Sequence, residues 1–181
     1  MNIFYVDESP VESAKMLCDR HVVKMAIETS QMLANCFSEE VLSLESTPKT
    51  QKGTIRKYSH WNHPSSKWVR ESKSNMNWLI DHGMELCHEK KRRYPNKPMP
   101  FVYEFLQWCK DNMDLSEVPE GELTLAPQCM PDYCKQDDLV SAYRNYYVKE
   151  KKDIASWKHG NVPTWFMEHG YRSHNKERMI K

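Results

Sequence analysis

Apolar residues recur at helical spacing over much of the chain. From Pro10 to about Asn35 they predict one long helix, because positions three and four apart share a face of an α-helix. Ser9 as N-cap, Pro10 in the first turn and Glu12 three residues after the serine form the pattern of a capping box. The apolar face predicted for this helix consists of Val11, Ala14, Cys18, Val22, Met25, Thr29 and Met32.

Three further segments carry the same period. A second helix is predicted to begin at Pro64 and to reach Arg93, with Gly83 as the expected place for a bend. A third, shorter helix is predicted over residues 101–110. A fourth should begin after a cap at residue 137 or 138 and end near Trp157. A short extended segment, residues 3–6, precedes the first helix.

Two regions lack this periodicity and are interpreted as loop insertions. Residues 38–59 are polar, with a short helical turn expected near residues 39–44, and residues 111–135 are rich in proline. The chain of 181 residues is long enough for one domain with its own core. We therefore predict an all-α fold: a compact single domain (1–181), a bundle of about four main helices with a short extended N-terminal segment and irregular insertions.

Composition excludes several classes of protein. No apolar run reaches the roughly 18 residues that a membrane-spanning helix needs, and the N-terminus lacks the pattern of a signal peptide. We expect a cytoplasmic, DNA-associated protein without a membrane contact or an evident obligate protein partner. The six cysteines have no paired CxxC rhythm and are interpreted as reduced thiols. Cys129 and Cys134, with His88 or Cys109, are an alternative zinc set that the spacing does not demand. We expect no metal and no cofactor.

A polar stripe interrupts the first predicted helix. His21, Lys24, Glu28 and Gln31 follow one another at spacings of three, four and three, which places them on one helical face. A carboxylate, an amine and an imidazole are the groups that acid–base or imine chemistry uses. The stripe is therefore either the lining of a functional site or a solvated helix face. Lys24 and Glu28 are also spaced as an ordinary ion pair, which is the favoured interpretation of that lysine.

Cations and aromatic residues alternate in the C-terminal third. This pattern suits stacking on bases and contacts with phosphates, although some of the aromatic residues must belong to the core. Two basic runs, residues 90–93 and 149–158, are equally well explained as polyanion-binding patches or as solvated helix ends despite a formal net charge of +1. The alternating residues are Tyr143, Arg144, Tyr146, Tyr147, Lys149, Lys151, Lys152, Trp157, Lys158, Trp165 and Arg172.

Three segments, in order, resemble the small pyrimidine-dimer DNA glycosylases, also called phage endonuclease V. Asp19-Arg20-His21 followed by Glu28 is similar to the family's Asp-x-His with a glutamate seven residues after the histidine. Residues 78–89 (Trp-Leu, a gap of four, then Met-Glu-Leu-Cys-His-Glu) are similar to its second long helix. Residues 163–170 (Pro-Thr-Trp-Phe, then Gly170) are similar to its C-terminal Pro-Thr-Trp-aromatic-x-x-x-Gly motif.

The resemblance implies a helical enzyme that binds double-stranded DNA, kinks it and flips out a nucleotide. Such enzymes attack C1′ with an N-terminal amine, pass through an imine and cut the strand by β-elimination. Glu28 matches the catalytic glutamate, and His21 would line the same cleft. We expect a base-excision glycosylase, with or without lyase activity at abasic (AP) sites. An enzyme that modifies or hypermodifies a DNA base, and a non-catalytic DNA-binding protein, remain the alternatives.

Two departures from the family pattern bear on the chemistry. The family's amine belongs to a small residue exposed by removal of the initiator methionine, whereas Asn2 favours retention of Met1. The nucleophile would then be the Met1 amine or another group, such as Lys24. Where the family places arginines for phosphates, this chain has Ile27 and Gln31, and a glutamine can bind a base edge.

The expected catalytic residues are Glu28, His21, Met1 and Lys24. The expected DNA-binding residues are Gln31, Arg20, Arg144, Tyr147, Lys158, Trp165, Phe166, Arg92 and Arg93.

Overall fold

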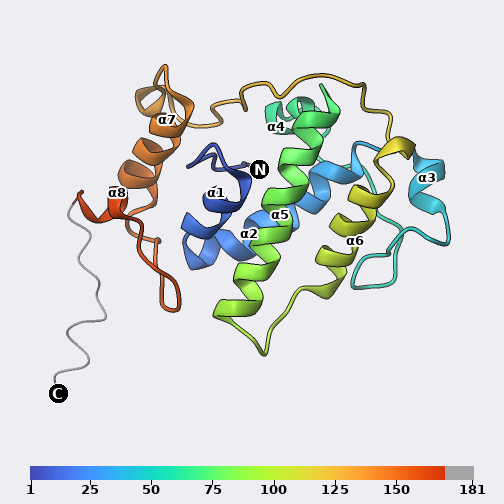
Figure 1. Cartoon of the computed structure of the whole chain (residues 1–181), viewed down its shortest axis with the longest axis horizontal. Coiled ribbons are helices and arrows are strands. Elements are labelled where there is room, and N and C mark those ends of the chain that lie inside the picture. Colours follow the sequence, from blue (N-terminus) through green and yellow to red (C-terminus); the bar gives the residue numbers. More distant parts are fainter. Residues whose placement is uncertain (170–181) are drawn as a thin grey trace.

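Two long helices, α2 (Asp19–Ala34) and α5 (Lys73–Arg93), pack against each other at the centre of the molecule. The computed structural model describes residues 1–169, and within them the chain forms α-helices and no strand. α1 (Pro10–Met16) and α6 (Pro100–Asp111) also pack against α5 (Figure 1). The predicted all-α class and single compact unit are confirmed.

Short helices complete the fold around this centre. They are α3 (Glu39–Ser43), α4 (Pro64–Trp68), α7 (Leu139–Tyr146) with a π-helical turn (Tyr147–Lys151), α8 (Thr164–Met167), and 3₁₀ turns at Met113–Leu115 and Asp132–Cys134. The predicted third helix is confirmed as α6. The short helical turn expected near residues 39–44 is confirmed as α3. The loop interpretation of residues 111–135 needs only the two 3₁₀ turns added.

The crossing of α2 and α5 depends on Gly83. A Cβ atom at this position would lie 2.6 Å from Thr29 Cγ2, so only a glycine lets the two helices approach so closely. α5 runs on through this residue from Lys73 to Arg93. Gly83 therefore serves the packing of α5 against α2.

Three predicted helix boundaries were wrong. The first predicted helix is divided, because Leu17 and Cys18 are extended between α1 and α2. The second is divided after α4, and Ser72 caps α5 by accepting a hydrogen bond from the Asn75 backbone N–H at 3.1 Å. The fourth begins at its Asp138 cap as predicted, but its helical turns end at residue 151 and do not reach residue 157.

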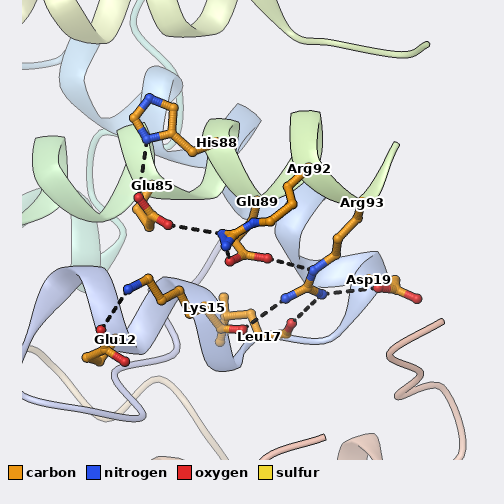
Figure 2. A network of polar contacts seen from close by, with 9 residues as sticks. All are labelled: Glu12, Lys15, Leu17, Asp19, Glu85, His88, Glu89, Arg92 and Arg93. Carbon is orange, nitrogen blue, oxygen red and sulfur yellow. Dashed lines mark hydrogen bonds and ion pairs between the residues drawn. The ribbon is translucent and has the colours of Figure 1, made fainter. Parts of the chain in front are cut away.

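A buried guanidinium explains the first of these breaks (Figure 2). Arg93 donates to the backbone carbonyls of Lys15 and Leu17, each at 2.9 Å, and so replaces the helical hydrogen bonds that would continue α1. Its remaining contacts are ion pairs with Glu89 at 2.8 Å and Asp19 at 3.1 Å. With a side chain only 1% exposed, Arg93 is a structural cation inside the fold.

Asp19 extends this network to the C-terminal part of the chain. Its second carboxylate oxygen accepts the Lys158 backbone N–H at 2.8 Å and the Ser156 hydroxyl at 3.4 Å. Asp19 also donates its backbone N–H to the Ser156 carbonyl at 2.8 Å. The start of α2 is therefore tied both to α5 and to the segment that leads to α8.

Two histidines are enclosed in the core as neutral rings. His82 stacks on Trp78 with ring centroids 5.1 Å apart, and neither ring nitrogen has a hydrogen-bond partner in residues 1–169. Burial lowers the pKa of His82 to about 3. The pKa of His21 is also lowered to about 3, chiefly by burial and further by nearby cations. Both rings resist protonation in the folded protein.

We expect Arg93→Met to lower the free energy of unfolding by about 3–5 kcal/mol, because buried Asp19 and Glu89 would lose this cation. The control is Arg92→Met, since Arg92 is 56% exposed while pairing with Glu85 and Glu89; its effect should stay below about 1 kcal/mol. Urea denaturation monitored by circular dichroism measures both. Equal losses in the two variants would contradict the structural role of Arg93.

The free energy of unfolding should decrease as the pH is lowered from about 6.5 to 5. Both histidines have folded-state pKa values of about 3, below the unfolded value of 6.5, so the unfolded chain binds protons that the folded chain refuses. Each contributes a loss of up to about 1.4 kcal/mol per pH unit in this window, and nothing above it. We expect His82→Leu to halve this slope without loss of stability at pH 7.5. An unchanged slope in urea titrations across the window would refute this origin.

Candidate active site

Glu28 is surrounded by three nitrogen groups. Its Oε2 atom accepts a hydrogen bond from the Asn2 backbone N–H at 3.0 Å and lies 3.8 Å from the α-amine nitrogen of Met1. Its Oε1 atom lies 3.5 Å from Lys24 Nζ. The Glu28 side chain is 12% exposed, whereas Lys24 is 62% exposed. The polar stripe of α2 thus meets the first residues of the chain at this carboxylate.

The N-terminal segment is held tightly over Glu28. The Asn2 side chain accepts hydrogen bonds from the two following backbone N–H groups, at 2.7 and 3.2 Å, and donates to the Cys129 carbonyl at 2.8 Å. The Met1 side chain is buried, and the Ser66 hydroxyl donates to its sulfur at 3.3 Å. These contacts fix where the α-amine points before any ligand binds.

Phe4, two residues after Asn2, anchors the N-terminal segment in the core. Its backbone lies in the left-handed region, with φ at +57°, which few residues other than glycine adopt. Its ring stacks on His21 with centroids 4.2 Å apart and on Tyr146 at 5.7 Å. His21 is itself buried and hydrogen-bonded to the Tyr147 hydroxyl. The expectation that His21 lines the cleft is therefore corrected, because its ring supports Phe4 from within the core.

Three cations lie near His21, at the N-terminal end of α2. The charges of Lys151, Lys24 and Arg20 each lower the pKa of His21, after the larger effect of burial, so all three lie within electrostatic reach of that ring. Arg20 and Lys24 are exposed, and Lys151 is half-buried against the Tyr146 ring at 4.5 Å. Cationic side chains therefore gather around His21, and one of them, Lys24, reaches Glu28.

His63 lies within electrostatic reach of the N-terminal amine and Glu28, and sequence reasoning missed it. Burial, and then the charge of the N-terminal amine, lower the pKa of His63, while the Glu28 charge acts in the opposite sense. Its Nδ1 atom accepts the Ser65 backbone N–H at 3.2 Å, which caps α4. The only signal in the sequence was a histidine directly before the proline that opens a helix.

Several residues expected to bind DNA are structural. Arg93 lies in the buried network described above, and Tyr147 is enclosed in the core with its hydroxyl near Cys18. Phe166 is also buried. Arg144, whose side chain is 33% exposed, donates to the Val6 carbonyl at 2.9 Å and pairs with Asp7 at 3.6 Å, so its expected role in DNA binding stays a prediction. The aromatic and cationic alternation therefore reports largely on packing.

The expected residues that stay accessible are Arg20, Lys158, Arg92, Gln31 and half-buried Trp165, whose indole N–H donates to the Met16 sulfur at 3.4 Å. In the first basic run, Lys90 is buried over the Tyr94 ring at 4.1 Å, so half of that run is internal. Gly170 and Arg172 lie outside the described residues.

The thiols and carboxylates do not converge on a metal. In the part of the chain that the structure describes, no group of three or more His, Cys, Asp or Glu side chains is placed to hold an ion. Cys129, named in the zinc alternative, instead has its sulfur 3.5 Å from the Ser65 hydroxyl, close to the N-terminal segment. Among residues 1–169, no helix is both long and apolar enough to cross a membrane.

Comparison with known proteins identifies one family. A family model described as pyrimidine dimer DNA glycosylase matches residues 1–100, which is more than half of the 181 residues. The matched region contains Met1, Glu28 and His63, whereas the Pro-Thr-Trp-Phe motif lies beyond it. No curated protein and no solved structure matches the chain. A DNA glycosylase type of function, with DNA as substrate, is thereby supported, and the chain belongs to the pyrimidine dimer DNA glycosylase family.

Proposed function

We propose that the protein is a base-excision DNA glycosylase in which an N-terminal amine attacks the sugar and Glu28 assists. The observation that carries this proposal is the distance of 3.8 Å between the Met1 α-amine nitrogen and Glu28 Oε2. A nucleophile and an acid–base group must lie within hydrogen-bond reach, or one water apart, to act on the same atom.

The proposed reaction begins with a nucleotide flipped out of the duplex, because C1′ is shielded in the stack. The amine lone pair forms the N–C1′ bond while the glycosidic bond breaks, and the base leaves with its electron pair and takes up a proton. Loss of the amine proton and opening of the sugar ring give an imine. Removal of a C2′ proton then expels the 3′-phosphate by β-elimination. Glu28 would stabilise the cationic sugar or imine and carry the protons.

The site supplies an amine whether or not the initiator methionine is removed. The Asn2 nitrogen donates to Glu28 Oε2 at 3.0 Å and would become the α-amine if Met1 were absent. Lys24 is the weaker candidate. Its side chain is largely exposed and its amine lies 3.5 Å from Glu28 in the i,i+4 geometry of an ion pair. We therefore assign Lys24 to charge neutralisation and phosphate contact.

The DNA-binding surface proposed here is the positive border of the site. Arg20, Lys24 and Lys151 contribute charges that attract the phosphates of a DNA duplex, and Lys158 and Trp165 extend this surface. Arg93 and Tyr147 are left out of it because both are buried. A base-modifying enzyme or a non-catalytic DNA-binding protein has no comparable observation in its favour, because neither requires an amine beside Glu28.

We expect Glu28→Gln to reduce strand cleavage at an abasic site in duplex DNA by at least about 100-fold, since the carboxylate that moves protons is lost. Borohydride trapping of the covalent adduct measures the imine directly. Glu117→Gln, on the exposed loop after α6, is the matched control. DNA binding measured by fluorescence anisotropy should survive in both variants. Full cleavage by Glu28→Gln would remove the catalytic role.

An uncleavable Gly-Ser extension before Met1 should abolish borohydride trapping, because it moves the amine away from Glu28. Lys24→Met should retain trapping and lose only part of its affinity for DNA. Mass spectrometry of the trapped peptide then identifies the adduct on Met1 or on Asn2. Trapping by the extended protein but not by Lys24→Met would reassign the nucleophile to the lysine.

A further inference from the structure

A pocket of about 670 Å³ opens on the face of α2 next to Glu28. α2 contributes Ile27 and Gln31 to its wall, and residues 50–59 and 98–102 supply the rest. Gln31 lines the pocket and is three positions after Glu28, so it stands about one helical turn from the carboxylate. The volume is typical of sites that enclose a small organic ligand.

Exposed apolar side chains form part of the pocket wall. Tyr58, Phe101 and Ile27 line it and keep unusually large exposed areas for such side chains. Arg56 holds two of the lining segments together, because its guanidinium donates to the carbonyls of Pro48 at 3.3 Å and Phe101 at 2.7 Å. Exposed aromatic and apolar surface of this kind suits a planar ring.

Two polar groups in the pocket lack partners. The Ser59 hydroxyl oxygen is buried and has no hydrogen bond within residues 1–169, a costly state unless a ligand or water completes it. The Gln31 amide likewise forms no hydrogen bond with any residue that the structure describes, and it offers both a donor and an acceptor. A planar ring with a hydrogen-bonding edge matches such a pocket.

Resting on the proposed function, we infer that this pocket binds the extruded nucleobase and that Gln31 and Ser59 determine which base is accepted. The base stacks against the apolar wall, and its polar edge bonds to the Gln31 amide and the Ser59 hydroxyl. Gln31 lies one helical turn from Glu28, so the sugar of the same nucleotide remains beside the amine. Glutamine amides bind base edges through paired donor and acceptor contacts.

Isoleucine methyl NMR tests this pocket without any reaction. The chain has six isoleucines, and Ile27 lines the pocket whereas buried Ile80 does not. Deoxyadenosine, deoxyguanosine, deoxycytidine and thymidine are titrated separately to about 10 mM, in the range of millimolar affinities. We expect at least one nucleoside to shift the Ile27 methyl signal saturably through its ring current, with Ile80 unmoved.

Gln31→Ala and Ser59→Ala should each weaken that binding about three- to tenfold, the effect of one lost hydrogen bond. Gln107→Ala, a helical glutamine outside the pocket, is the matched control and should bind as the unaltered protein does. Thermal denaturation of each variant separates weakened binding from unfolding. An unmoved Ile27 signal with all four nucleosides, or unchanged affinity in folded Gln31→Ala and Ser59→Ala, overturns the inference.

The outcome is distinguishable from that of the proposed function. Borohydride trapping on abasic DNA reports on the amine and Glu28, and it involves no nucleoside. Unaltered protein that traps the imine but binds no nucleoside overturns the pocket inference alone. Protein that binds a nucleoside at Ile27 but forms no adduct overturns the amine mechanism alone.

Discussion

The structure depends on the burial of one guanidinium. Arg93 is enclosed at the end of α5, where a cation must find acceptors for its donors, and it finds them in the carbonyls of Lys15 and Leu17 and in two carboxylates. Those carbonyls are the ones that would have continued α1, so satisfying the cation stops that helix and lets α2 begin at Asp19. The break sets the direction in which α2 leaves the junction, and Glu28 lies nine positions further on.

Satisfied polar groups also fix the position of the N-terminal residues. The Asn2 side chain satisfies two backbone N–H groups and the Cys129 carbonyl, while its own N–H bonds to Glu28. The stacked rings of Phe4 and His21 hold the segment against the core. An amine held in this way has already lost much of its freedom before DNA arrives, so less entropy would oppose the proposed attack on a bound sugar. The neutral state of His21 fits this supporting role.

Local patterns predicted the helices and the polar stripe, but not the long-range partners that end helices or bury charges. Periodicity is a property of neighbouring residues, so it located α2 and marked Glu28 as unusual. The Arg93–Asp19 pair spans 74 positions, and an arginine at the end of a basic run looks solvated until its acceptors are known. For the same reason the tyrosine-rich helix resembled a nucleic-acid surface, although Tyr147 packs inward. His63 was missed because its relation to the amine exists only in space.

On the proposed function, Glu28 separates two kinds of recognition on α2. Arg20, Lys24 and Lys151 supply positive charge near the N-terminal end of α2. Such charges would contact phosphates irrespective of the base. On either side of Glu28 in the sequence, Ile27 and Gln31 stand where the resembling family places arginines, and here both line a pocket. Replacing a phosphate contact by a glutamine costs nonspecific affinity but adds a group that distinguishes base edges. On the proposed function, substitutions on the pocket side would therefore change the accepted base while the amine and its carboxylate stay in place.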